Sequence, residues 1–449
     1  MLTSTKLSNS YAYTVQQWKT DMIAAQQIGV DGFALNWIPP DCVSPSLGWQ
    51  VDAIDDAFTA AAAQGFKLMY SFDMSWSTCI TYWNQTFMAD MITKYAGNPA
   101  TYRWNGNILV STYGGDAVDR YGNGFLQGLK DALKYTNAIS LAPALTTYSM
   151  AAQTDPAKEA AALISDYPSV DGFLNWQAWP LDAHSNMTMS ADDAFKSALK
   201  QAAKTGPYIM AISPWQYKDL NNGNPLDSWV AYSDTLFPSR FESLLDPTTT
   251  QPDIIELLTW NDFSESHYLR DLPLSRTDTT ATDYVELGEM GNYVWAHAHA
   301  PWRIIAKYYI HWWKSGARPA ITMDQVVYWY RVHPRAAVCQ AGSSVPVRNR
   351  DFPADAVFAW ALVRDPATVS VRLGEGVETV FEADGTGPVL AMVPFPEVIG
   401  TAGVVPEVRI LRGGAVVRES WGKVPIRGDC TWQDFNPVVG LCGLGVNHG

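Results

Sequence analysis

The sequence predicts an α/β fold, with a (β/α)8 barrel of the TIM type over residues 1–316 and a C-terminal β-sandwich over residues 317–449. Short apolar runs alternate with amphipathic stretches up to residue 315, as in a parallel sheet that helices cover. Beyond residue 317, short alternating runs are separated by turns rich in Gly and Pro, as in a sandwich. The length of 449 residues suits one large domain and one smaller domain.

The first domain contains seven predicted strands with helices between them. The strands are residues 30–37, 66–73, 107–113, 139–146, 170–177, 207–215 and 254–262, and the clearest helices are residues 14–28, 51–64, 123–135 and 191–204. A barrel needs an eighth strand, and the only place for it is before residue 13. The segment there, MLTSTKLSN, has no clear apolar alternation. We therefore expect the first strand to be weak, shortened or missing.

An open, doubly wound sheet is the alternative arrangement for such a chain. That fold usually binds a nucleotide through a glycine-rich loop that follows a strand. The nearest match, YGGDAVDRYGNG at residues 113–124, does not fit the GxGxxG pattern. A weak internal repeat, VDGFALNWIPP at 30–40 and VDGFLNWQAWP at 170–180, fits a duplicated half-barrel, although chance or shared strand chemistry explains it equally well.

The second domain begins after Gly316, which is predicted to cap the preceding helix. Its predicted strands are residues 357–363, 368–373, 377–383, 389–395, 407–413 and 415–421. Such a domain either binds substrate or braces the barrel, and its sequence favours neither role.

The composition excludes several classes of partner. The net charge of −14 and the pI near 4.9 argue against nucleic acid, because nucleic-acid-binding proteins need basic faces. No apolar run approaches the roughly 18 residues that a membrane span needs. The chain has 19 Trp, 21 Tyr and 16 Phe, more than an ordinary core needs. Because Trp beside Asp, Asn and Tyr is typical of proteins that bind sugars, we expect a neutral, hydroxylated ligand.

The cysteine pattern indicates no metal site. The five cysteines are Cys42, Cys79, Cys339, Cys430 and Cys442, with no CxxC pair among them, and the seven His residues are scattered. We therefore expect no zinc site and no cofactor. Cys430 and Cys442 are close enough in sequence to form a disulfide. Glycosylation sequons begin at Asn84 and Asn186, while the N-terminal residues contain no apolar segment of the signal-peptide type.

Polar and aromatic residues collect where the predicted strands end. In a barrel of this kind, the active site lies at the carboxyl ends of the strands. The residues there are Asn36, Trp37, Asp73, Trp76, Tyr113, Asp116, Asn175, Trp176, Gln177, Trp179, Ser213, Trp215, Tyr217, Trp260, Asn261, Asp262, Glu265, Ser266, His267 and Tyr268. Trp faces stack on sugar rings, while Asp and Asn form hydrogen bonds with hydroxyl groups. The strand ends therefore predict a cleft for an uncharged, ring-shaped ligand.

Asp262 and Glu265 are the candidate catalytic pair. Hydrolysis of a glycosidic bond requires one protonated carboxyl group and one ionised carboxyl group. Their spacing keeps the two Cα atoms within about 10 Å, and unequal surroundings would separate their pKa values. The alternative is that one carboxylate caps the next turn while the other pairs with Arg270. Asp73 is a third candidate, with a strand-end cap as its alternative role, and His267 is expected to orient a carboxylate.

Several motifs together resemble a known family. They are NSYAYTVQQWKTDM, GVDGFALN, FKLMYSFDMSW, DGFLNWQAWP, ISPWQY, TWNDFSESHY and YYIHWWKSG. This set is similar to glycoside hydrolase family 71, the fungal α-1,3-glucanases that are also called mutanases. The resemblance implies a barrel and sandwich that cleave α-1,3-glucan of fungal walls or bacterial mutan, with endo action and inversion. It also implies a secreted or cell-wall protein, whose signal peptide is not in this chain, and we expect a monomer.

The same resemblance implies roles for individual residues. The carboxylates of the family motif in TWNDFSESHY are catalytic, so Asp262 and Glu265 take that role. Our preferred assignment has Glu265 as general acid and Asp262 as base, with Asp73 supporting the substrate or the transition state. The other Trp, Tyr, Asn, Asp and His side chains at the strand ends are expected to bind the polysaccharide.

Two departures from the family leave alternative functions open. Relatives begin with an apolar strand where this chain has MLTSTK, and many carry a carboxylate where this chain has Gly114, with Asp116 as the nearest replacement. A catalytically impaired glucan-binding protein is therefore the competing hypothesis, although the presence of both motif carboxylates argues against it. A retaining glycosidase is a second alternative, with its carboxyl groups about 5–5.5 Å apart, against about 6.5–9.5 Å for an inverting enzyme.

Overall fold

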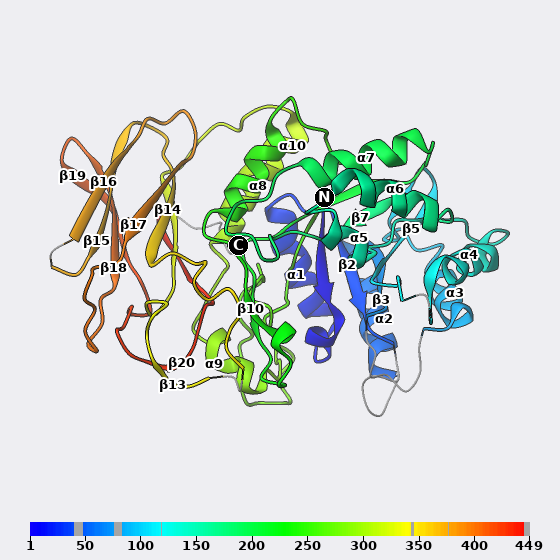
Figure 1. Cartoon of the computed structure of the whole chain (residues 1–449), viewed down its shortest axis with the longest axis horizontal. Coiled ribbons are helices and arrows are strands. Elements are labelled where there is room, and N and C mark those ends of the chain that lie inside the picture. Colours follow the sequence, from blue (N-terminus) through cyan, green and yellow to red (C-terminus); the bar gives the residue numbers. More distant parts are fainter. Residues whose placement is uncertain (40–47, 76–82, 118, 343–344, 376, 444–449) are drawn as a thin grey trace.

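The computed structural model describes residues 1–39, 48–75, 83–117, 119–342, 345–375 and 377–443. The first part of the chain forms a parallel sheet with helices around it, and the second part forms antiparallel sheets (Figure 1). Helices α8 (Leu236–Leu245) and α10 (Trp302–Ser315) lie between the two parts. The predicted α/β class is confirmed.

Eight parallel strands follow one another along the first part. They are β1 (Leu2–Lys6), β2 (Gly32–Trp37), β3 (Lys67–Asp73), β5 (Asn107–Tyr113), β6 (Ile139–Leu141), β7 (Phe173–Asn175), β8 (Tyr208–Ile212) and β11 (Ile254–Leu257). They lie in the order β6-β5-β3-β2-β1-β11-β8-β7, so the first and last strands are neighbours. Between β6 and β7, the N–H of Leu174 donates to the carbonyl of Pro143 at 3.1 Å. This is the strand order of a (β/α)8 barrel.

The helices of the first part begin and end at recognisable sequence signals. Besides α8 and α10 they are α1 (Val15–Gln27), α2 (Gly48–Gln64), α3 (Gln85–Lys94), α4 (Gly122–Leu133), α5 (Thr146–Ala151), α6 (Pro156–Asp166), α7 (Ser190–Gln201) and α9 (Gly291–Val294). Thr14 and Gln17 form a capping box at the start of α1. Gly316 ends α10 with a φ of 69°, the left-handed conformation expected of the predicted C-cap.

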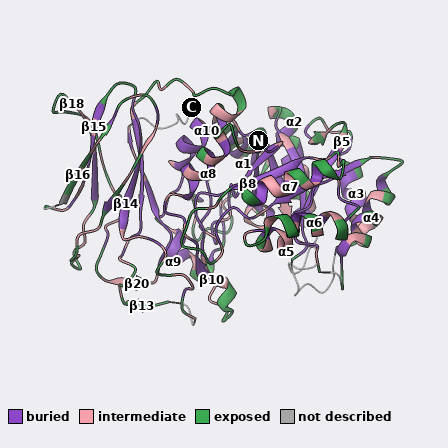
Figure 2. Cartoon of the chain, turned by 45° about the horizontal axis from the view of Figure 1, so that its top comes forward, coloured by how far each residue is buried: buried purple, intermediate pink, exposed green. Residues whose placement is uncertain are grey.

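Shorter elements complete the first part. They are β4 (Arg103–Trp104), β9 (Tyr217–Asp219), β10 (Ser228–Val230) and the 3-10 helices Leu7–Ser10, Pro225–Asp227 and Gly288–Met290. Among the described residues, no helix combines the length and the apolar character that crossing a membrane requires. Figure 2 shows that the strands are buried beneath helices whose outer faces are exposed.

Strand β1 corrects one expectation. The first strand is neither weak nor missing, because it pairs along its whole length with β2 and also pairs with β11. Leu2 packs on the inner side of the curled sheet, whereas Ser4 and Lys6, on the same side of the strand, line a cavity at its carboxyl end. The polar inner face of this strand concealed it from a search for apolar alternation. Thr3 and Thr5 are buried on the opposite side, and β-branched residues suit a strand.

Two four-stranded antiparallel sheets form most of the second part, in the orders β17-β14-β12-β21 and β16-β15-β18-β19. The strands are β12 (Gln325–Tyr330), β14 (Ala356–Leu362), β15 (Ala367–Leu373), β16 (Val377–Ala383), β17 (Val389–Pro394), β18 (Pro406–Arg412), β19 (Ala415–Trp421) and β21 (Val438–Gly443). Side chains of both sheets, such as Val357, Val369 and Val408, share one apolar cluster. The strands predicted between residues 357 and 421 are present, and β12 and β21 are additional.

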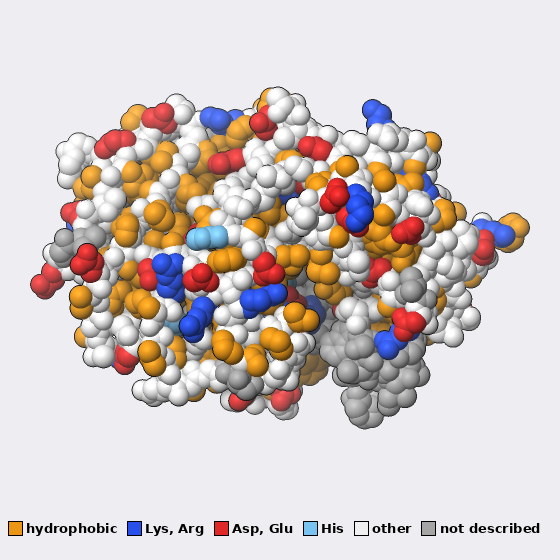
Figure 3. Space-filling model, in the orientation of Figure 1, with side chains coloured by type: hydrophobic (Ala, Val, Ile, Leu, Met, Phe, Trp, Pro, Cys, Tyr) orange, Lys and Arg blue, Asp and Glu red, His pale blue; other side chains and the backbone are white. Residues whose placement is uncertain are grey.

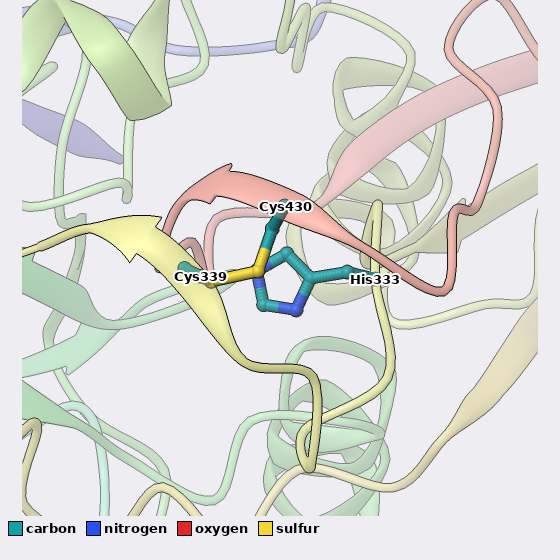
Figure 4. Close-up of side chains that lie close together, drawn as sticks. All are labelled: His333, Cys339 and Cys430. Atoms are coloured by element: carbon teal, nitrogen blue, oxygen red, sulfur yellow. A yellow bond between two sulfur atoms is a disulfide. The ribbon is translucent and has the colours of Figure 1, made fainter. Parts of the chain in front are cut away.

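The predicted disulfide between Cys430 and Cys442 is wrong. Cys430 is bonded to Cys339, which lies opposite it where β13 (Cys339–Ala341) pairs with β20 (Cys430–Trp432) (Figure 4). Cys442 is a buried free thiol on β21, where its side chain joins the cluster between the two large sheets. Sequence separation alone did not reveal that the two cysteines face different surroundings.

His333 lies beside this disulfide but has no ring nitrogen available for a metal. Its Nδ1 is 2.9 Å from the carbonyl oxygen of Pro334, and its Nε2 accepts the N–H of Asp434 at 2.9 Å. The two sulfur atoms are bonded to each other. His333 and the disulfide therefore hold this part of the chain in place and are not arranged as a metal centre.

Candidate active site

A cavity of about 470 Å³ opens at the carboxyl ends of the barrel strands. It brings together residues from eight separate segments of the sequence. The lining includes Lys6, Asn36, Trp37, Asp73, Tyr113, Trp176, Lys218, Asp227, Asp262, Glu265 and His267. Both carboxylates of the candidate pair are therefore in one cavity, together with Asp73. On the face shown in Figure 3, Lys and Arg are scattered among Asp and Glu and form no continuous basic patch.

Asp262 is held on one side of the cavity by Lys6 and by its own loop. The Nζ of Lys6 is 3.2 Å from each carboxylate oxygen, and the Oγ of Ser264 donates to one of them at 2.8 Å. The backbone N–H of Asp262 donates to the Oγ1 of Thr259 at 2.8 Å. The side chain of Asp262 is 13% exposed and lines the cavity, so these contacts do not enclose it completely.

Glu265 has different neighbours. The Nζ of Lys218 is 3.5 Å from Oε1, while Oε2 accepts the side-chain amide of Gln216 at 3.2 Å and lies 3.4 Å from Nε2 of His267. The next residue, Ser266, has a φ of 63°, a left-handed conformation that few residues other than glycine adopt. This tight turn directs Glu265 and His267 toward the same region. The predicted orienting contact of His267 with a carboxylate is present in the structure.

The charges around Glu265 determine its protonation. Burial acts to raise the pKa of Glu265, but Lys218, His267 and Lys6 outweigh burial and hold this pKa well below its ordinary value. Burial likewise acts to lower the pKa of Lys218, but Glu265 and Asp227 raise it to about 12. At neutral pH, Glu265 is therefore an ionised carboxylate beside a charged lysine.

Asp73 and Tyr113 face the cavity from the neighbouring strands β3 and β5. Asp73 accepts the N–H and the hydroxyl of Ser75 at 3.0 and 2.7 Å, so it acts as a local cap and also lines the cavity. Burial raises the pKa of Tyr113, and Glu265 and Asp73 raise it further, so Tyr113 keeps its hydroxyl proton. The ring of Tyr113 lies 4.6 Å from that of Trp176, and together they form an aromatic wall.

Several predicted binding residues lie outside the cavity lining. The side chain of Asn175 donates to Asp192, Trp179 stacks on His267 with ring centroids 5.3 Å apart, and Trp260 packs on Phe33. The side chain of Asn261 accepts the N–H of Lys6 at 2.7 Å and donates to its carbonyl, and Asp116 accepts the N–H of Thr147. These side chains support the site without reaching the cavity. Trp76 lies outside the described residues.

Trp215, Tyr217 and Tyr268 also lie outside the cavity and contact the segment 433–437, which precedes β21. Trp215 Nε1 donates to the carbonyl of Phe435 at 2.9 Å, and the Tyr217 hydroxyl donates to that of Gln433 at 3.0 Å. The Tyr268 hydroxyl accepts a hydrogen bond from the Asn436 side chain at 3.3 Å. These aromatic residues therefore anchor the C-terminal part of the chain to the back of the site.

Sequence reasoning missed the two lysines of the cavity. Lys6 lies in the segment that did not look like a strand, and Lys218 follows the motif ISPWQY directly. Continuing the list of strand-end residues by one position would have found Lys218. No comparable signal identified Asp227, which reaches the cavity from a 3-10 helix.

Comparisons with known proteins show which family and which proteins this chain resembles. Residues 4–445 match the model of a family described as glycosyl hydrolase family 71. A mutanase of Penicillium rubens is 30% identical over 95% of this chain and 85% of its own length. A glucan endo-1,3-alpha-glucosidase of Schizosaccharomyces pombe is 31% identical over 83% of this chain and 80% of its own length. An ascus wall endo-1,3-alpha-glucanase of the same yeast is 24% identical over 94% and 91%, respectively.

Proposed function

The chain belongs to glycosyl hydrolase family 71, and from this premise we propose that it hydrolyses α-1,3-glucosidic bonds in α-1,3-glucan, with endo action and inversion. The observation that carries the proposal is the meeting of Asp262 and Glu265 in one cavity at the strand ends. Glycosidic bond hydrolysis needs two such carboxyl groups on either side of the bond. The aromatic wall of Tyr113 and Trp176 suits the apolar faces of glucose rings.

The roles of the two carboxylates follow from their surroundings. Because Glu265 is held ionised by Lys218, it is suited to take a proton from the attacking water, and we assign it as the base. Asp262 is then assigned as the general acid, which donates a proton to the leaving oxygen. This assignment reverses the one preferred from the sequence. Asp73, across the cavity, is assigned to support the substrate or the transition state.

The proposed architecture completes the account of the scaffold. The eight parallel strands are assigned to a closed (β/α)8 barrel over residues 1–316, and the two large antiparallel sheets to a β-sandwich within residues 317–449. The hydrogen bond from the N–H of Leu174 to the carbonyl of Pro143 supports closure of the sheet between β6 and β7. The disulfide between Cys339 and Cys430 supports action outside the cytosol, in the medium or the cell wall, because disulfides persist in oxidising compartments. A monomeric state stays a prediction.

Reducing-sugar release from insoluble α-1,3-glucan tests the reaction. We expect the parent chain to release sugar and its Glu265→Gln variant to lose at least a hundredfold in rate, while both give the same circular dichroism spectrum. A folded parent that binds the glucan without cleaving it would contradict the proposal and favour the impaired glucan-binding protein. That alternative rests on a missing first strand. In the structure, β1 is present and pairs with both β2 and β11.

Products and leaving groups test the mechanism. Proton NMR during the first minutes of hydrolysis is expected to show the β-anomer, and the α-anomer would indicate a retaining enzyme. On an aryl α-glycoside of an α-1,3-linked oligosaccharide, whose leaving group needs no protonation, the Asp262→Asn variant should recover activity. The Glu265→Gln variant should recover only when azide is added as a nucleophile. The opposite pattern would restore Glu265 as the acid.

A further inference from the structure

We propose that Lys218 is a positioning residue that keeps Glu265 negatively charged and turned toward the substrate cavity. The inference rests on the proposed glucan hydrolysis and names one further residue on which that reaction depends. Lys218 lies on β9, the short strand that follows β8, and its side chain is 17% exposed. The ammonium group therefore acts from a largely enclosed position, where charge interactions are stronger than in water.

The backbone fixes Lys218 relative to Glu265. The N–H of Tyr217 donates to the carbonyl of Glu265 at 3.3 Å, so β9 and the catalytic loop are bonded directly beside the ion pair. Gln216, on the other side of Tyr217, donates its side-chain amide to Oε2 of Glu265 at 3.2 Å. Three consecutive residues, Gln216, Tyr217 and Lys218, thus contact Glu265 from one segment.

A second carboxylate holds Lys218 in place. Its Nζ is 3.0 Å from Oδ1 of Asp227, while Oδ2 of Asp227 accepts the side-chain amides of Asn222 and Asn224 at 2.9 and 3.0 Å. Asp227 lies in the 3-10 helix just before β10, which pairs with β9. The loop between these two strands therefore limits the directions in which Lys218 can point.

Several acidic groups near Glu265 oppose a negative charge on it. Asp262 and Asp73 line the same cavity and repel a negative charge on Glu265, and the Tyr113 hydroxyl also faces it. Lys6 is engaged by Asp262, while His267 lies 3.4 Å from Oε2 of Glu265. Lys218 therefore supplies a positive charge at ion-pair distance from Glu265, at 3.5 Å from Oε1. Without it, two like charges would share a partly dry cavity, which favours protonation of one of them.

The pH dependence of kcat/KM, measured on the full chain with a soluble α-1,3-linked oligosaccharide, tests the proposal. In Lys218→Met, the limb along which activity rises with pH is expected to move to higher pH by about one unit or more, because an opposite charge at this distance lowers a carboxyl pKa by about 1–3. Lys218→Arg keeps the charge and is expected to keep the parent profile. A residue that only supported the fold would lower activity without moving the limb.

Lys130→Met is a matched control. Lys130 forms an ion pair with Asp171 at 2.7 Å, and its side chain is 25% exposed, but it lies outside the cavity lining. Its loss removes a comparable ion pair and is expected to leave the pH profile unchanged. A Lys218→Met profile that coincides with that of the parent, or a Lys218→Arg profile that moves as far as that of Lys218→Met, would overturn the proposal.

A second readout does not depend on activity. Carbon-13 NMR of labelled glutamate carboxyl groups follows the ionisation of Glu265, whose signal is identified by its loss in Glu265→Gln. The midpoint of this titration should rise in Lys218→Met, which removes the positive charge. It should fall in Asp227→Asn, because Lys218 is then no longer paired with a second carboxylate. If Lys218→Met does not fold, the direction in Asp227→Asn decides, and an unchanged or higher midpoint would overturn the proposal. A parent without glucanase activity but with these NMR shifts would refute the proposed function alone.

Discussion

Each carboxylate of the proposed catalytic pair is matched by a lysine from a different segment of the chain. Lys6 reaches Asp262 from β1, and Lys218 reaches Glu265 from β9. Their positive charges offset the repulsion between two acidic side chains in one cavity, which would otherwise raise a carboxyl pKa. Because neither lysine is near its partner in a recognisable motif, the sequence alone identified the acids and not the cations.

The site residues that could be predicted share one property. Asn36, Asp73 and Tyr113 all lie at the carboxyl end of an apolar strand, and the cavity collects such positions in any barrel. The same rule also selected Trp215 and Tyr217, which face the C-terminal segment instead. Whether a strand-end side chain points into the cavity or behind it depends on packing with distant segments, and a single sequence carries no local signal for that.

Glu256 is a buried acid that the proposed mechanism does not use. It lies on the same side of β11 as Ile254, which packs inside the barrel. Its carboxyl oxygens have no hydrogen-bond partner among the described residues. Burial raises the pKa of Glu256 to about 8, against a weaker opposing effect of the N-terminal amino group. The folded state therefore binds a proton here that the unfolded chain, with an ordinary pKa near 4.5, releases.

We expect Glu256→Gln to remove a pH-dependent loss of stability. A raised folded-state pKa lowers the free energy of unfolding as pH rises from about 4.5 to about 8, by about 1.4 kcal/mol for each tenfold change in proton affinity. The variant and the parent should therefore have similar melting temperatures at pH 5. At pH 8.5 the variant should melt several degrees higher.

Thermal melts followed by circular dichroism at pH 5, 7 and 8.5 would check this result. The exposed Glu382→Gln serves as a control for the loss of one carboxyl group. A constant difference between Glu256→Gln and the parent over this range would show that Glu256 does not change its protonation between the folded and unfolded states.

At the scale of elements, β1 and the strand-end loops show where sequence patterns fail. Strand β1 has both apolar and polar residues on its inner face. Leu2, near its start, packs inside the curled sheet, whereas Ser4 and Lys6, near its end, line the cavity. The predicted strand 254–262 ends at Leu257 in the structure, and the residues beyond it form the loop that carries Asp262 and Glu265. Sequence patterns therefore predict strands that end at a functional site to be longer or weaker than they are in the structure.

The disulfide between β13 and β20 is expected to stabilise the second part of the chain. Cys339 and Cys430 are 91 positions apart, so their bond restricts a long loop in the unfolded state. The double variant Cys339→Ala, Cys430→Ala should lower the free energy of unfolding by about 2–4 kcal/mol. Urea unfolding of parent and variant, both without reductant, measures this difference. Equal midpoints would mean that the bond does not stabilise the folded chain relative to the unfolded chain.

At the scale of the whole molecule, the C-terminal part of the chain supports the loop that carries the two proposed catalytic carboxylates. The Asn436 side chain donates to the carbonyl of Tyr293 at 2.8 Å, and the Tyr293 hydroxyl donates to the carbonyl of Ser264 at 2.8 Å. Ser264 lies between the two proposed catalytic carboxylates in the sequence. Trp329 and Trp360 of the second part also belong to the same buried cluster as the barrel core. Of the two roles left open by the sequence, these contacts favour bracing.

Asn436→Ala should therefore reduce catalysis from a distance. We expect kcat to fall by about tenfold to a hundredfold, because small displacements of catalytic groups have effects of this size, while KM changes little. Thr431→Ala, at an exposed position on the preceding strand β20, is the control and should behave like the parent. Steady-state kinetics on a soluble α-1,3-linked oligosaccharide would check both. An unchanged kcat would show that the loop around Ser264 holds its shape without this support.

The order of synthesis gives the C-terminal brace a further consequence. A ribosome translates residues 257–268 well before residues 433–437, so a nascent chain contains both carboxylates while Trp215, Tyr217 and Tyr268 still lack their partners. A product of early termination would carry an intact catalytic motif on an unsupported loop. We therefore expect chains that end before residue 433 to cleave glucan more slowly than the full chain.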